Sequence, residues 1–109
     1  MSESIKKNSD FQHIYQSGKS YANRYLVMYV VESEKSCTRL GISVSKKVGN
    51  SVVRHRVKRL IKESFRLNLE QFKTGYDIIV IARSTAKGKN YSDISSALLH
   101  LGKLHNIVE

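Results

Sequence analysis

Hydrophobic and polar residues alternate along Arg39–Ser45, and this pattern predicts a β-strand. Leu40, Ile42 and Val44 fall on one face, while small or polar residues fall on the other. Successive side chains of a strand point to opposite faces of the sheet. We therefore expect one face of this strand to enter the core and the other to stay open.

Two other segments are apolar at both odd and even positions. Tyr25–Val31 and Asp77–Ala82 are rich in aromatic and β-branched residues, which strands favour. Because both faces of each segment are apolar, we expect both to be covered by other layers, with Asp77–Ala82 as a central strand.

Amphipathic helices are predicted near both ends of the chain. The first begins at Ser9 and Asp10 and stops at Gly18, and the last follows a cap at Ser92. Apolar residues recur at helical spacing in both segments. They are Phe11, Ile14 and Tyr15 in the first helix and Ile94, Ala97, Leu98 and Leu101 in the last.

The segment after the alternating strand predicts a longer helix with two chemically distinct faces. Asn50 or Ser51 is expected to cap it, and it is expected to extend to Phe72. At about 100° per residue, apolar and cationic residues separate onto different sides. The apolar side has Val53, Val57, Leu60, Ser64 and Leu67, with Ile61 just beyond, and the cationic side has Arg54, Arg56, Lys58, Arg59, Lys62 and Arg66, with His55 among them.

The order of these elements is α-β-β-α-β-α, which predicts an α/β (α+β) two-layer sandwich with about three or four strands. The 109 residues suffice for a single domain, residues 1–109, with a core of its own. Residues 1–8 are polar and are expected to be flexible. A lone cysteine, Cys37, and the lack of a signal peptide predict a reducing, cytoplasmic setting.

Positive charge is concentrated in one stretch of the chain. Lys46–Arg66 contains eight basic residues and one acid, which is +7 of the formal net charge of +10. Basic helix faces usually include acids that form i,i+4 pairs, whereas only Glu63 interrupts this one. The stretch is therefore expected to bind a polyanion. An anionic membrane is the competing partner, but the stripe of Val, Leu and Ile is typical of packing on a sheet and lacks the bulk of membrane-surface helices, which favours nucleic acid.

The sequence contains no pattern typical of catalysis or of a metal site on this chain. The nine acids are dispersed, and the four histidines lack ligand spacing, whereas a protein nuclease needs clustered carboxylates or paired histidines. We therefore predict no catalytic residue and no metal ligand here.

Aromatic residues predict a second binding element. Phe11 and Tyr15 share a helix face, and Tyr29 lies in the middle of a predicted strand. Core packing is the alternative role, and it is favoured for Phe11 alone. Tyrosine hydroxyls need partners in a dry core, so an aromatic face beside cations fits single-stranded nucleic acid equally well.

The chain resembles the protein component of bacterial ribonuclease P over three segments. In Arg39–Phe65, a serine- and lysine-rich strand end and a Gly-Asn turn precede an Arg-x-Arg-x-x-Lys-Arg helix. Asp10–Tyr29 carries DFQ, Gly-x-Ser and Ala-Asn-Arg at the family's spacing, and Asp77–Arg83 reads DIIVIAR. The chain departs from the family pattern at Ser51, His55 and Lys62, where Ala, Asn and Arg are usual, and these changes keep hydrogen bonding and charge.

The resemblance implies that the chain pairs with a large catalytic RNA and that the complex removes the 5′ leader of precursor tRNA. It places Mg²⁺ and the catalytic groups mainly in the RNA and requires no protein partner or membrane. It also implies a left-handed β-α-β crossover, against the usual right-handed preference. The RNA-binding motif would comprise Lys46, Lys47, Asn50, Arg54, His55, Arg56, Lys58, Arg59 and Lys62, and the leader cleft Phe11, Tyr15, Ser20, Tyr29 and Ser43.

A small ribosomal-type protein or a general RNA-binding chaperone is the alternative function, since any basic α/β domain qualifies. A self-sufficient nuclease ranks below both because the carboxylates are dispersed.

Overall fold

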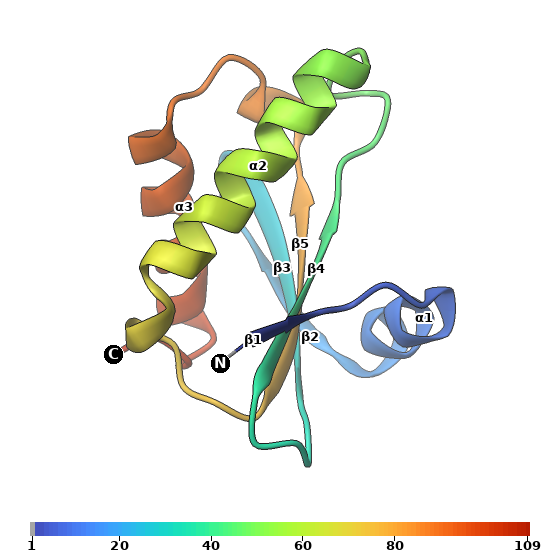
Figure 1. The fold of residues 1–109 in the computed structure, drawn as a ribbon, viewed down its shortest axis with the longest axis vertical. Helices are drawn as coiled ribbons and strands as arrows, with labels where there is room; N and C mark the ends of the chain where they lie inside the picture. Colours follow the sequence, from blue (N-terminus) through green and yellow to red (C-terminus); the bar gives the residue numbers. More distant parts are fainter. Residues whose placement is uncertain (1) are drawn as a thin grey trace.

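A mixed sheet of five strands, with helices on both faces, organises residues 2–109, which the computed structural model describes (Figure 1). The order of the strands across the sheet is β1-β4-β5-β3-β2. The elements are β1 (Ser2–Ser4), α1 (Asn8–Ser17), β2 (Lys19–Ala22), β3 (Leu26–Glu32), β4 (Thr38–Ser43), α2 (Ser51–Leu67), η1 (Leu69–Gln71), β5 (Tyr76–Ala82), η2 (Ser84–Ala86) and α3 (Tyr91–Leu104).

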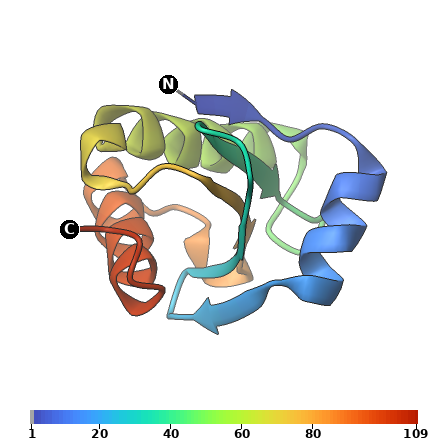
Figure 2. The same ribbon diagram turned by 90° about the horizontal axis from the view of Figure 1, so that it is seen from below.

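Strand β5 lies in the middle of the sheet, as its apolar faces predict. It runs parallel to β4 and antiparallel to β3, and Ile78, Ile79 and Val80 have no exposed surface. Helices α2 and α3 cover one face of the sheet, and α1 covers part of the other (Figures 1 and 2). The α+β class is thus confirmed, with two more strands than the predicted order contains and with α1 as a partial third layer.

The connection from β4 through α2 to β5 joins two parallel, neighbouring strands. Viewed in Figures 1 and 2, α2 crosses over the face that it shares with α3, and the chain returns to β5 in the left-handed sense. This matches the crossover that the resemblance implies and departs from the general right-handed preference. It places the start of α2 beside the end of β4.

Helix α2 is amphipathic as predicted, but its C-terminal end lies earlier than expected. The Asn50 side chain accepts a hydrogen bond from the Val53 N–H at 3.0 Å, which confirms Asn50 as the cap. The helix ends at Leu67 and does not reach Phe72, because Asn68 donates to the Ser64 carbonyl at 2.7 Å and a 3₁₀ turn follows.

The buried side of α2 differs from the predicted apolar stripe at two positions. Phe65 projects into the cationic arc, yet it is buried and packs on Phe72 with ring centroids 4.9 Å apart. Leu67 belongs to the projected apolar stripe, yet its exposed fraction is 57%. Both differences follow from a buried stripe that is turned toward Ile61 along the whole helix, since Val53 and Leu60 of the predicted stripe are only half-buried.

Neither edge strand was predicted from the sequence. Ser2–Ser4 pairs in parallel with β4, and the Ile5 N–H donates to the Leu40 carbonyl at 2.9 Å with Ile5 buried. Residues 1–8 were expected to be flexible, and the pairing of β1 within this range was not predicted. At the other edge, β2 pairs antiparallel with β3.

The first and last helices begin earlier than predicted. Helix α1 starts at Asn8. Helix α3 is capped by Asn90 and not by Ser92, because Asn90 and Asp93 form a reciprocal capping box. Within residues 2–109, no helix combines the length and the apolar character that crossing a bilayer requires.

Candidate nucleic-acid interface

The solvent-facing side of α2 presents the predicted cations, and Glu63 is the one acid within this helix. His55, Lys58, Arg59 and Lys62 border a shallow groove of about 190 Å³ and are all exposed. Among the ion pairs of residues 2–109, the one on α2 joins Arg66 to Glu63 at the far end of the helix. The groove is therefore a concentrated positive surface suited to phosphate.

The other cations of the motif lie around the start of α2. Lys46 and Lys47 are exposed in the loop that follows β4. Arg54 is half-buried, and its Nε donates to the Gly49 carbonyl at 3.2 Å. Asn50 serves as the helix cap, so a structural role accounts for its side-chain oxygen.

Arg56 is turned away from the groove toward the loop before α3. Its Nη1 donates to the Lys89 carbonyl at 2.9 Å, and it lines a separate pocket with Val53 and Lys87. The basic motif thus splits between two sides of α2, which the sequence pattern does not distinguish.

The aromatic residues of the predicted cleft come together between α1 and the sheet. The Tyr15 ring lies 5.1 Å from the Tyr29 ring in an edge-to-face arrangement and 6.2 Å from the Phe11 ring. Strand register places Ser20 directly opposite Tyr29. The structure therefore brings four of the five predicted cleft residues into one group.

Glycine at position 41 allows Phe11 to lie on the sheet. A Cβ atom there would sit 2.8 Å from Phe11 Cζ and 3.2 Å from Ile5 Cβ, and such close contacts force neighbouring groups to move. Gly41 is two residues before Ser43 on the same face of β4. The absence of a side chain at position 41 thus sets how closely α1 approaches the sheet.

An ion-pair network fastens the start of α1 to the sheet. Arg39 Nη2 and Nε donate to the two carboxylate oxygens of Asp77 at 2.7 and 2.9 Å, and Nη1 donates to Asp10 at 3.3 Å. The hydrogen bond with Asp77 is the main cause that raises the pKa of Arg39. The two acids nearest the cleft are therefore already paired with a permanent cation.

Ser43, the fifth predicted cleft residue, lies between the aromatic group and the basic helix. It lines a cavity of about 410 Å³ together with Arg54, His55 and Lys58. Burial raises the pKa of Tyr15, and the neighbouring Ser43 hydroxyl partly offsets this effect. The two predicted binding elements thus form one continuous surface.

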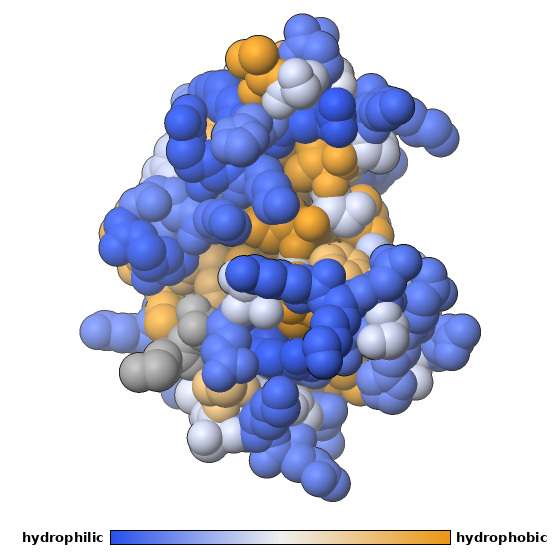
Figure 3. Space-filling model, turned by 45° about the vertical axis from the view of Figure 1, so that its right-hand side comes forward, coloured by the Kyte–Doolittle hydropathy of each residue, from blue (hydrophilic) through white to orange (hydrophobic). Residues whose placement is uncertain are grey.

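Half-exposed apolar residues complete this surface and were not predicted. Val27, Ile81 and Ser43 occupy one row across β3, β5 and β4, and all three are half-buried. Tyr29 is also half-buried, so the expectation that both faces of this strand are fully covered is wrong. On this side of the molecule, apolar surface shows between two hydrophilic regions (Figure 3). The alternation of β3 between buried and half-buried positions is visible only once its neighbours are known.

No group of three His, Cys, Asp or Glu side chains that could hold a metal ion occurs in the part of the chain that the structure describes. The surface offers cations, aromatic rings and hydroxyl groups, which can bind and orient a nucleic acid.

Comparison with known sequences identifies close relatives. A family model described as Ribonuclease P matches residues 1–105. The ribonuclease P protein component of Lachnoclostridium phytofermentans is 63% identical over 108 residues, covering 99% of this chain and 93% of that protein. The corresponding protein of Clostridium botulinum strain Langeland is 57% identical over 100 residues, covering 91% of this chain and 90% of that protein.

Solved structures share the fold. The ribonuclease P protein of Staphylococcus aureus superimposes with a TM-score of 0.89 at 45% identity and covers 97% of both chains. The protein from Thermotoga maritima superimposes with a TM-score of 0.84 at 32% identity, covering 91% of this chain and 94% of that one.

The Gly41–Phe11 contact can be tested by a double-mutant cycle. We expect Gly41→Ala to lower the free energy of unfolding by about 1–3 kcal/mol, because the added methyl group overpacks the space under α1. In a Phe11→Leu background the ring atom nearest position 41 is gone, so the same substitution should cost less. Urea denaturation of the four proteins measures both effects. If Gly41→Ala lowered the free energy of unfolding equally in both backgrounds, the added methyl group would not be clashing with Phe11.

Proposed function

Because this chain belongs to the ribonuclease P protein family, we propose that it binds the catalytic RNA of that enzyme through α2 and the 5′ leader of precursor tRNA through the cleft beneath α1. The complex then cleaves the leader from the precursor. A single observation carries the proposal: Ser43, which neighbours Tyr15, lines a cavity together with the α2 cations Arg54 and Lys58.

The basic groove supports binding of structured RNA. Lys58, Arg59 and Lys62 are exposed along one side of α2, and charge neutralisation by such residues releases counterions from the RNA. Arginine adds bidentate contacts to phosphate that lysine cannot make.

The cleft supports binding of an unpaired strand. Tyr29 and Tyr15 present aromatic rings beside half-exposed Val27 and Ile81, and bases of any sequence can stack on such a surface. Ser43 adds a hydroxyl group at the end nearest α2. An extended leader would therefore run from the aromatic rings toward the basic helix.

We assign the protein the task of binding and orienting, with the reaction itself in the RNA. Asp10 and Asp77 are the acids beside the cleft, and both pair with Arg39. That donor set does not fit Mg²⁺, which prefers oxygen ligands free of competing cations. We infer that the magnesium ions of the reaction are held mainly by the RNA, and we derive no step on this chain that uses them.

Reconstitution tests this function directly. The protein, a bacterial ribonuclease P RNA and precursor tRNA are combined at low magnesium, where added cationic binding surface has the greatest effect. We expect stimulated cleavage at the mature 5′ end. Absence of stimulation would favour a general RNA-binding protein, and cleavage by the protein alone would show a self-sufficient nuclease.

Salt dependence tests α2 as the docking face. Arg59→Ala should weaken binding to the RNA and reduce the slope of log K against log salt by about 0.7–0.9, the contribution of one phosphate contact. Arg66→Ala is the matched control, because it removes the same charge from the same helix at a position already paired with Glu63. Equal changes in the two variants would mean that net charge matters and the groove does not.

Leader binding tests the cleft. Tyr29→Leu should weaken binding of precursor tRNA by roughly 1–3 kcal/mol, the contribution of one stacked base, and should spare mature tRNA, which has no leader. Tyr21→Leu is the control, since Tyr21 packs on His105, on the side of the sheet away from α1, with ring centroids 4.7 Å apart. If Tyr29→Leu weakened both substrates equally, the cleft would have no specific part in leader binding.

A further inference from the structure

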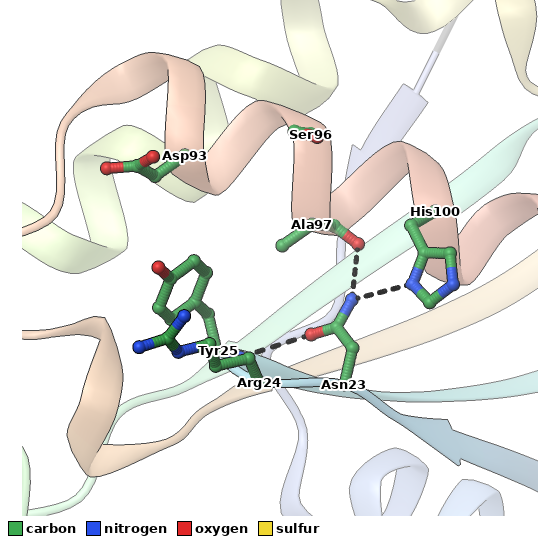
Figure 4. A pocket seen from close by; sticks show the side chains of 7 residues that line it. All are labelled: Asn23, Arg24, Tyr25, Asp93, Ser96, Ala97 and His100. Carbon is green, nitrogen blue, oxygen red and sulfur yellow. Dashed lines mark hydrogen bonds between the residues drawn. The ribbon is translucent and has the colours of Figure 1, made fainter.

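A pocket of about 240 Å³ opens between the β2–β3 turn and α3, on the opposite side of the sheet from α1 (Figure 4). Arg24 and Tyr25 line it from the turn, and Asp93 and His100 line it from α3. Its volume falls below the roughly 300–1,000 Å³ of sites for drug-sized ligands. The pocket therefore suits a single ring system with attached polar groups.

Asn23 holds the two walls of this pocket in place. Its Nδ2 donates to the Ala97 carbonyl at 2.9 Å and lies 3.1 Å from His100 Nδ1. Its Oδ1 accepts hydrogen bonds from the backbone N–H groups of Tyr25 and Leu26 at 3.2 and 3.0 Å. The turn that carries Tyr25 is thus fixed against α3 before any ligand binds, which lowers the entropy cost of binding.

Two cations gather around the Tyr25 ring. The guanidinium carbon of Arg24 lies 5.6 Å from the ring centroid, and Lys89 Nζ lies 5.5 Å from it. Neither cation takes part in an ion pair within residues 2–109. The Asp93 carboxylate accepts from the Asn90 N–H in the capping box of α3. An aromatic ring with unneutralised cations beside it is the arrangement that binds an unpaired nucleotide.

The loop that carries Lys89 is linked to the basic helix by a direct contact. Arg56 of α2 donates to the backbone carbonyl of Lys89 at 2.9 Å. A positively charged path therefore leads from the start of α2, over the loop before α3, to Tyr25. RNA bound along α2 can follow this path without crossing the sheet to the cleft beneath α1.

We propose that this pocket binds an unpaired nucleotide of the RNA that docks on α2, with its base against Tyr25 and its phosphate between Arg24 and Lys89. This inference rests on the proposed function, because it takes that RNA to be the catalytic RNA. The substrate leader is the other source of an unpaired nucleotide, but the aromatic residues of the proposed leader cleft pack with α1, which covers the opposite face of the sheet. Asp93 and His100 offer polar groups to the edge of the base.

Affinity measurements with three variants test the inference. Tyr25→Leu should bind ribonuclease P RNA at least about fivefold more weakly, whereas Tyr25→Phe, which keeps the ring, should bind within about twofold of the unchanged protein. The preference for precursor over mature tRNA should be the same in both variants. Arg59→Ala serves as the reference for docking on α2.

The outcomes separate this inference from the proposed function. If Arg59→Ala weakens binding and Tyr25→Leu does not, the pocket plays no part in RNA binding and the inference is overturned. If neither variant weakens binding, the proposed docking on α2 fails as well. If Tyr25→Leu instead removes the preference for precursor tRNA, the nucleotide comes from the leader and our assignment to the catalytic RNA is wrong.

Tyr25 packs partly against the core, so a second measurement guards against loss of folding. Amide chemical shifts of the unchanged protein are followed during titration with a short single-stranded oligoribonucleotide. We expect shifts at residues 24–26 and 96–100 as well as on α2. Shifts confined to α2 and the α1 cleft would overturn the inference.

Discussion

Burial of one side of α2 against the sheet is the interaction on which the binding surface depends. Val57, Ile61 and Phe65 are almost fully buried, and each such side chain contributes roughly 1.5–3 kcal/mol. Lys58 and Lys62 are like charges four residues apart, and such a pair costs only about 0.2–0.5 kcal/mol on a helix. Apolar burial therefore outweighs the repulsion that crowded cations cause, and the helix can present most of them to solvent.

A second, smaller core lies on the opposite face of the sheet, and α1 covers only part of that face. Ile14 and Ile79 are fully buried beneath α1, Phe11 lies over Gly41, and Arg39 ties α1 to β5 through Asp77. Because α1 covers only part of this face, aromatic and aliphatic side chains remain half-exposed beside it. The same packing that positions α1 thus leaves room for an unpaired strand.

The left-handed β4–α2–β5 connection brings the two surfaces together. It lets Ser43, at the end of β4, share a cavity with Arg54 at the start of α2. On the far side of α2, the contact between Arg56 and Lys89 extends the positive surface to the pocket at Tyr25. These surfaces are the ones through which we propose that the chain binds RNA.

The amino-acid sequence predicted the central strands, the amphipathic character of α2 and a cap at Asn50 or Ser51, because these depend on periodicity and on neighbouring residues. It also identified the cations and aromatic residues that line the candidate interface. The packing of the whole chain was needed to show that β1 and β2 form the edges of the sheet, that Phe65 is buried against Phe72, and that Asn23 joins the β2–β3 turn to α3. Each of these features is a contact between segments far apart in the chain. Such contacts depend on how the whole chain packs, so local sequence patterns do not predict them.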